Sequence, residues 1–160
     1  MSYLIRRMTN ADLGQVVAID RASFSLPWPE KSYRFEVNEN PAARCWVAET
    51  SGRIVGALVL WLLVDEVHIA TIAAHPEDRR KGIARSLMLH ALAEAVGEGA
   101  TTARLEVRAG NAAAQELYRR LGFTESARRS GYYKDNAEDA VLMENGDLGS
   151  TMRVLITEAR

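Results

Sequence analysis

The sequence predicts one mixed α/β domain over residues 1–160, with a sheet that is antiparallel at first and gains a crossover helix later. Two β-rich segments, Arg44–Glu49 and Ile54–Val64, flank a Gly-bearing turn and indicate a hairpin. Further along, small and apolar residues recur at i, i+3, i+4, i+7 and i+11 from Ala84 to Ala95. This period is typical of a helix with one buried face.

The other elements of the first half follow from turn and cap signals. We expect a short strand at Tyr3–Met8 and then a helix capped by Thr9 or Asn10. Two prolines interrupt the chain before a second helix, which begins at Pro29 and ends near Asn38. A strand at Val67–Ala74 closes this half.

The second half predicts a strand, a helix and a final pair of strands. The strand is Ala103–Val107, and the helix is Asn111–Leu121 with Asn111 as its N-cap. The final strands are Phe123–Arg129 and Ala140–Glu144. The tail from Asn145 to Arg160 receives no assignment.

Composition excludes several classes of protein. A net charge of −1 argues against a protein that coats nucleic acid, and the apolar run Ile54–Val64 is too short to span a membrane, so neither is an expected partner. The single cysteine, Cys45, allows no internal disulfide and indicates a cytoplasmic protein. The three histidines form no close pair of metal ligands, so no metal is expected, and we assign no role to His68 or His75.

A basic loop at the start of the long helix is the most informative segment. The first amide groups of a helix lack partners and lie at the positive end of its dipole. Gly82 and Ala84 would let an anion approach them closely. The loop adds positive charge at Arg79, Arg80, Lys81 and Arg85. Spacing alone leaves two interpretations open, a phosphate site or a helix-start glycine beside a solvated loop.

The segment Arg79-Arg80-Lys81-Gly82-Ile83-Ala84 resembles the Q/R-x-x-G-x-G/A signature of the GNAT acetyltransferases. The resemblance implies a central mixed, mostly antiparallel sheet flanked by helices, with splayed strands that bind acetyl-coenzyme A. It implies that the loop amides hold the pyrophosphate and that the preceding strand lies along the pantetheine arm. The implied donor-binding residues are Ile72, Ala73, Ala74, Arg79, Arg80, Lys81, Gly82, Ile83, Ala84, Arg85, Asn111 and Tyr118.

Further blocks resemble one subgroup, the ribosomal-protein alanine N-acetyltransferases and related N-terminal acetyltransferases. These blocks are Phe24–Trp28, Leu105–Arg108, Asn111–Ala114 with Leu117-Tyr118, Tyr132-Tyr133 and Glu138–Ala140. The resemblance implies direct acetyl transfer to a protein N-terminus, such as the N-terminal alanine of a ribosomal protein. The tail after Met143 departs from the subgroup pattern and leaves the surroundings of the acceptor site open.

Acetyl transfer to an amine needs a group that takes the amine proton. On a strand, Glu106 faces away from its neighbours Leu105 and Val107. From the residues alone, the favoured interpretation of Glu106 is an exposed carboxylate paired with Arg104 or Arg108. The resemblance assigns it the role of general base.

A departing thiolate also needs a proton. Tyr118 lies on the apolar face of its helix and can simply be a core aromatic. The resemblance assigns it the role of general acid, which is compatible with burial because tyrosine carries a polar tip.

Aromatic residues form the predicted acceptor site, although plain packing explains them equally well. The residues are Phe24, Leu26, Pro27, Trp28, Tyr132 and Tyr133. Two rival functions remain open at this point. One is an acetyltransferase for lysine, polyamine or small-molecule amines, and the other is a non-catalytic sensor of acyl-coenzyme A.

Overall fold

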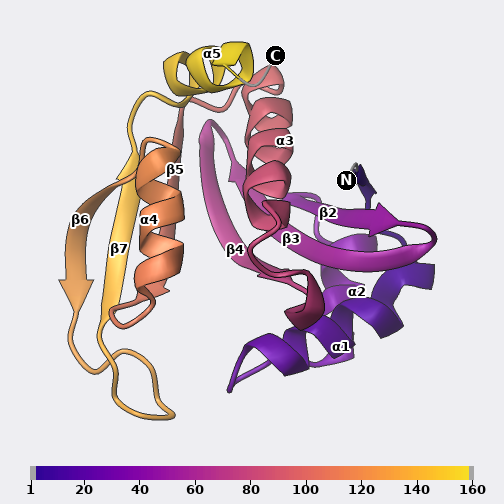
Figure 1. Cartoon of the computed structure of the whole chain (residues 1–160). Coiled ribbons are helices and arrows are strands. Elements are labelled where there is room, and N and C mark those ends of the chain that lie inside the picture. Colours follow the sequence, from indigo (N-terminus) through magenta and orange to yellow (C-terminus); the bar gives the residue numbers. More distant parts are fainter. Residues whose placement is uncertain (1–2, 159–160) are drawn as a thin grey trace. The chain divides into compact units, whose positions relative to one another are not determined.

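The computed structural model describes residues 3–158. Its strands are assigned to one seven-stranded sheet in the order β1-β2-β3-β4-β5-β7-β6, and five α-helices accompany them (Figure 1). The contacts divide the chain into two compact units. The first unit runs to Leu62 and resumes over Ala70–Ala91, and the second takes Leu63–Ile69 and the chain from Leu92 onward. The mixed α/β class is confirmed, and a single domain stays a prediction.

The antiparallel hairpin of the first unit is confirmed. Strands β2 (Ala43–Thr50) and β3 (Arg53–Leu63) pair from Ala43 opposite Trp61 to Thr50 opposite Arg53. Ser51 and Gly52 make the turn with φ of 50° and 75°, left-handed values that glycine adopts without strain. Strand β1 (Leu4–Arg7) pairs antiparallel with β2.

Helices α1 (Leu13–Ser23) and α2 (Glu30–Asn38) pack with the hairpin. Thr9 caps a short 3-10 helix (η1, Asn10–Asp12) that leads into α1, and Pro29 is the N-cap of α2. Their shared core contains Met8, Leu13, Val16, Val17, Ile19, Tyr33, Cys45, Val47, Ile54, Ala57 and Val59.

Strand β4 (Glu66–Ala74) and helix α3 (Ile83–Gly97) each contribute to both units. Within the first unit, α3 begins against β3, because a Cβ built on Gly56 would meet Ile83 at 2.7 Å and Leu87 at 2.9 Å. Only glycine allows this close approach of helix and strand.

The second unit surrounds strand β5 (Thr102–Arg108). The start of β4 pairs parallel with β5 over three residue pairs, which end at His68 opposite Arg104. On its other side β5 pairs antiparallel with β7 (Ala140–Asn145), which in turn pairs with β6 (Thr124–Arg129). The predicted strands and the crossover helix between β4 and β5 are thus confirmed.

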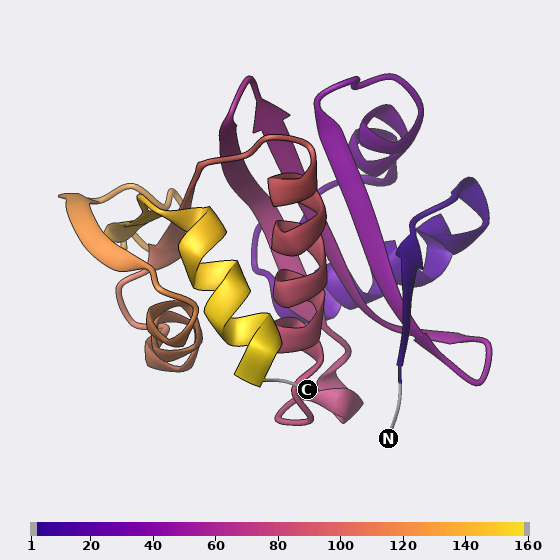
Figure 2. The same ribbon diagram turned by 90° about the horizontal axis from the view of Figure 1, so that it is seen from above.

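The tail that the sequence left unassigned is a helix, α5 (Leu148–Glu158), drawn in yellow after β7 in Figure 1 and Figure 2. Leu148 and Met152 are buried, and the Leu148 amide donates to the Thr101 carbonyl at 3.0 Å. Helix α5 therefore belongs to the packed part of the second unit. Of the helices in residues 3–158, none has the length and apolar character needed to cross a membrane.

Candidate active site

The first unit contains the basic loop, which we call the donor loop (residues 75–82). It leaves β4, forms a short 3-10 helix (η2, Pro76–Asp78) and reaches α3 through two left-handed residues, Arg80 (φ 65°) and Gly82 (φ 79°). The first i to i−4 bond of α3 runs from the Ser86 amide to the Gly82 carbonyl at 3.0 Å. The amides of Ile83, Ala84 and Arg85 precede that bond, and the first amides of a helix have no partner within the helix.

A buried aspartate holds the donor loop in place. Asp78 is 2% exposed, and its carboxylate accepts two hydrogen bonds from Arg53, at 2.9 and 3.2 Å. The Lys81 ammonium lies 3.3 Å from the same carboxylate. Hydrogen bonds from Arg53 hold the pKa of Asp78 below its ordinary value, despite the opposing effect of burial.

The predicted donor-binding cations therefore differ in their surroundings. Lys81 has an ion pair within the loop, and Arg79 donates to the Ser23 hydroxyl at 3.1 Å. Both side chains thus take part in holding the loop. Ile72, Ala73 and Ala74 are the half-buried end of β4, and their contact with the donor stays a prediction.

The second unit carries Glu106, and its partner is one that the sequence did not reveal. Leu105 and Val107 are buried, as strand alternation predicts, whereas Glu106 is half-buried on the other face of β5. Its Oε2 lies 2.9 Å from Nε2 of His68 on β4. The alternative pairs with Arg104 and Arg108 are absent from residues 3–158, since Arg104 binds Glu66 and Arg108 binds Asp135.

The contact with His68 sets the protonation of Glu106. An ionised carboxylate only accepts hydrogen bonds, so His68 Nε2 is the donor. This hydrogen bond lowers the pKa of Glu106 below its ordinary value and outweighs burial, which acts in the opposite direction. Glu106 is thus an anion at neutral pH. The sequence identifies no partner for His68, whereas the structure gives it one, Glu106. The pairing of two strands brings it to Glu106, and no local sequence signal reports that pairing.

Tyr118 combines a core position with a retained hydroxyl. It lies on α4 (Ala112–Arg120), is 7% exposed, and its ring centroid is 6.2 Å from that of Phe123. Burial raises the pKa of Tyr118 to about 12, and Tyr133 adds to the effect. Within residues 3–158 the Tyr118 hydroxyl has no hydrogen-bond partner, which leaves it open to a ligand.

The predicted helix cap at Asn111 is confirmed. Its Oδ1 accepts a hydrogen bond from the Ala114 amide at 3.2 Å. This bond satisfies one of the free amides at the start of α4, while a contact of Asn111 with coenzyme A stays a prediction.

The first unit holds the earlier of the two aromatic segments. Phe24 and Leu26 are 38% and 55% exposed, whereas the backbone of Trp28 is tied to buried Asp20 by a hydrogen bond of 2.7 Å. The Trp28 ring also lies 5.2 Å from that of Tyr33. Packing thus accounts for Trp28, while Phe24 and Leu26 remain available to an acceptor; Pro27 is also exposed.

The second aromatic segment lies between β6 and β7 in the second unit. Tyr132 is 43% exposed and its ring meets that of half-buried Tyr133 edge-on, with centroids 5.2 Å apart. The pKa of Tyr133 is raised by burial, and Glu106 contributes to the rise. Tyr133 therefore lies within electrostatic range of both Glu106 and Tyr118. In the described chain, no cluster of three His, Cys, Asp or Glu side chains could hold a metal ion.

The family model described as "Acetyltransferase (GNAT) family" matches residues 13–123. The chain belongs to this family. It is an N-acetyltransferase that uses acetyl-coenzyme A.

Individual relatives agree with this assignment. The chain is 35% identical over 139 residues to a putative [ribosomal protein bS18]-alanine N-acetyltransferase of Bacillus subtilis, covering 87% of this chain and 92% of the relative. It is 33% identical over 141 residues to the [ribosomal protein bS18]-alanine N-acetyltransferase of Escherichia coli K12, covering 87% and 94%. The crystal structure of the Escherichia coli ribosomal-protein-S18-alanine N-acetyltransferase superimposes with a TM-score of 0.83 at 31% identity, covering 90% and 93%.

Proposed function

We propose that this enzyme acetylates the α-amine of a protein N-terminus in the cytoplasm, and that its acceptor is an N-terminal alanine of a ribosomal protein. The names of the relatives at 33–35% identity support the acceptor class. The observation that carries the chemistry is the 2.9 Å contact between His68 and Glu106, which provides an ionised carboxylate.

Glu106 acts as the base in this proposal. An α-ammonium group has a pKa of about 7.7–8.0, so a substantial fraction is neutral near pH 8 and little help is needed to remove the proton. Glu106 is ionised, and His68 occupies one oxygen, Oε2, which leaves Oε1 to accept a proton directly or through one water. A lysine ammonium, with a pKa of about 10.4, would be a much poorer acetyl acceptor, because a carboxylate whose pKa is lowered is a weak base for removing its proton.

Tyr118 acts on the leaving group. A cysteine-like thiol has a pKa of about 8.5, far below the value of about 12 for Tyr118, so full proton transfer to a finished thiolate is unfavourable. The phenol instead donates a hydrogen bond to sulfur as negative charge develops there. This is transition-state stabilisation by a donor that is already in place.

The donor loop holds acetyl-coenzyme A. The free amides of Ile83 and Ala84, at the positive end of α3, suit the pyrophosphate, and Arg80 and Arg85 add charge there. The cytoplasm is proposed because the single cysteine, Cys45, allows no internal disulfide, which suits a reducing compartment.

The test follows thiol release from acetyl-coenzyme A with a panel of short peptides. The matched pair is one alanine-initiated peptide with a free N-terminus and the same peptide with a blocked N-terminus. A lysine-bearing blocked peptide and a polyamine complete the panel. Turnover of the free α-amine peptide alone is expected. Turnover of lysine or polyamine alone would reassign the acceptor, and coenzyme binding without turnover of the alanine-initiated peptide would reject that acceptor.

A further inference from the structure

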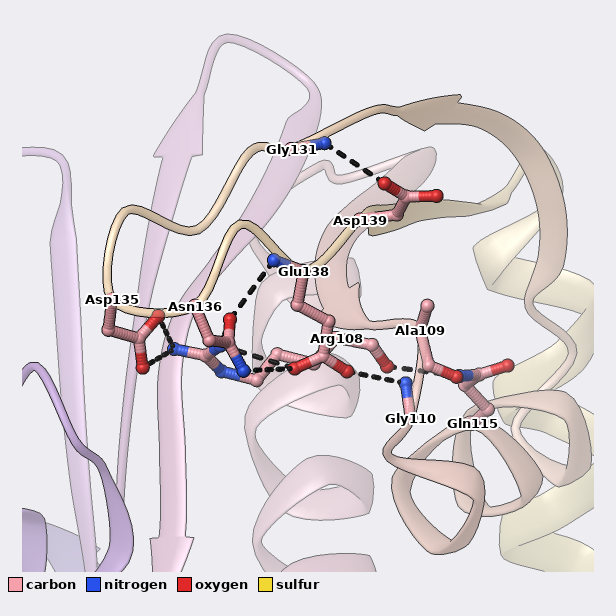
Figure 3. A network of polar contacts seen from close by, with 9 residues as sticks. All are labelled: Arg108, Ala109, Gly110, Gln115, Gly131, Asp135, Asn136, Glu138 and Asp139. Atoms are coloured by element: carbon pink, nitrogen blue, oxygen red, sulfur yellow. Dashed lines mark hydrogen bonds and ion pairs between the residues drawn. The ribbon is translucent and has the colours of Figure 1, made fainter.

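The loop between β6 and β7 is organised around one cation. We call residues 130–139 the acceptor loop, because they include Tyr132 and Tyr133. Figure 3 shows Arg108, the last residue of β5, pointing its guanidinium into this loop. Arg108 lies two residues after Glu106 and so on the same face of β5.

Arg108 contacts several parts of the acceptor loop at once. Its Nη2 donates to both carboxylate oxygens of Asp135 at 3.1 Å, and its Nη1 donates to Asn136 at 3.2 Å and to Glu138 at 3.3 Å. Its guanidinium carbon lies 4.0 Å from the ring centroid of Tyr133. The side chains of Arg108, Asp135 and Glu138 are 26%, 21% and 24% exposed, so the ion pairs are only partly shielded from water.

Main-chain bonds close the acceptor loop on itself. The Ala137 amide donates to the Tyr133 carbonyl at 2.8 Å, and the Tyr133 amide donates to the Glu138 carbonyl at 3.1 Å. The Gly131 amide donates to Asp139 at 2.9 Å (Figure 3). The loop therefore has a defined path, and the Arg108 guanidinium donates hydrogen bonds to three of its side chains, Asp135, Asn136 and Glu138.

Glu138 extends the network to the helix that carries Tyr118. Its Oε2 accepts a hydrogen bond from the Gly110 amide at 2.7 Å, next to Asn111, the N-cap of α4. A Cβ on Gly110 would lie 2.8 Å from that oxygen, so the contact is compatible with glycine. One network thus connects the end of β5, the start of α4 and the acceptor loop.

We propose that Arg108 is a positioning residue for the acceptor. It holds the Tyr133 ring and the acceptor-loop backbone in the conformation that receives the peptide. Its own charge is neutralised by Asp135 and Glu138, so it acts through the loop and not as a free cation. A planar guanidinium can bind two carboxylates and stack on a ring, which a lysine ammonium cannot reproduce. This inference rests on the proposed function, since it assigns the loop to the acceptor.

The test separates the two substrates kinetically. Arg108→Ala should raise KM for an alanine-initiated peptide by about tenfold, because a misplaced loop lowers productive binding. KM for acetyl-coenzyme A should stay within about twofold of the wild-type value. The peptide KM of Arg108→Lys should lie between those of the wild-type enzyme and Arg108→Ala. The matched control is Arg120→Ala on α4, which removes an exposed arginine that pairs with Glu116. An unchanged peptide KM, or a parallel rise of both KM values, would overturn the proposal.

Hydrogen exchange gives a second measurement that does not depend on activity. In Arg108→Ala the amides of residues 130–139 should exchange faster, while the rest of the second unit exchanges as in the Arg120→Ala control. Unchanged exchange in the loop, or faster exchange throughout the unit, would contradict a positioning role. If Arg108→Ala does not fold, Asp135→Asn should also speed amide exchange in residues 130–139, by a severalfold smaller factor. If the wild-type enzyme turns over no peptide, the proposed function fails, while the exchange comparison still decides the role of Arg108.

Discussion

The donor loop and the acceptor loop are each held by one ionised side chain, and these two side chains carry opposite charges. Asp78, an anion, holds the donor loop by forming ion pairs with Arg53 and Lys81. Arg108, a cation, holds the acceptor loop by forming ion pairs with Asp135 and Glu138. Each loop is therefore ordered by a central charge that is neutralised by its own partners.

Under the proposed function, the difference follows from what each loop would present to its substrate. In the donor loop the anion is buried, and the backbone turns at Gly82 so that helix amides remain for a phosphate. In the acceptor loop the cation is half-buried, and the 43% exposed Tyr132 remains on the outside. The comparison predicts that the two loops can be weakened separately, each affecting one substrate.

The largest effect is expected at a residue that belongs to neither loop. Glu106→Gln keeps the shape of the side chain but removes the base, so kcat should fall by about 10²–10³-fold. Both KM values should change by less than about twofold. The measurement is steady-state thiol release with each substrate varied, and the control is Glu116→Gln on the exposed side of α4. A near-normal kcat would remove Glu106 from the mechanism.

A smaller loss is expected at Tyr118. Tyr118→Phe removes one hydrogen-bond donor to the developing thiolate and should lower kcat by about ten- to a hundredfold. The free energy of unfolding should change by less than about 1 kcal/mol, because the hydroxyl has no partner within residues 3–158. Urea unfolding monitored beside the kinetics tests both statements. A large loss of stability with an unchanged kcat would support a purely structural tyrosine.

The donor loop should respond in the opposite way to the acceptor loop. Arg53→Ala removes the main partner of Asp78 and should raise KM for acetyl-coenzyme A by about tenfold, while the peptide KM stays within about twofold. The matched control is Arg34→Ala, an exposed arginine of α2 that pairs with Glu30. If Arg53→Ala changed the peptide KM as strongly as the donor KM, the two loops would not be independent.

The smallest effect is a shift in the pH at which Arg53→Ala loses coenzyme binding. The pKa of Asp78 is below its ordinary value, mainly because Arg53 donates to it. A carboxyl group of this kind adds stability above its unfolded pKa of about 3.9, and this stability is lost as pH falls through the folded pKa. Coenzyme binding by the wild-type enzyme should therefore persist to a lower pH than coenzyme binding by Arg53→Ala. Titration calorimetry between pH 3.5 and 6 measures this. Identical profiles for both proteins would contradict the role of Arg53.

Much of the fold could be predicted because its signals are local. The turn at Gly52, the cap at Asn111 and the alternation around Glu106 each depend on a few neighbouring residues, and the structure has all three. Helix α5 was missed because two glycines precede a short apolar patch. A usable signal was present, since Leu148 and Met152 stand four residues apart and are both buried.

The candidate site was predictable in part. The residue types and the donor-loop pattern were visible in the chain, whereas the partners of the charged residues were not. Hydrogen bonds and ion pairs act over about 3 Å, and strand pairing decides which groups come that close. Glu106 had arginines two positions away on either side, yet its partner is His68, which is 38 residues distant.

By itself, the sequence determined the class of the fold, the helix start at the donor loop and the presence of a strand carboxylate and a helical phenol. These features depend on backbone preferences and on the period of apolar residues, which any short segment carries within it. Only the tertiary structure decided that Asp78 and Arg108 are the centres of the two loops. The reason is that a charge on a folded chain is neutralised by whatever the fold places within a few ångströms, and that placement is a property of the whole unit.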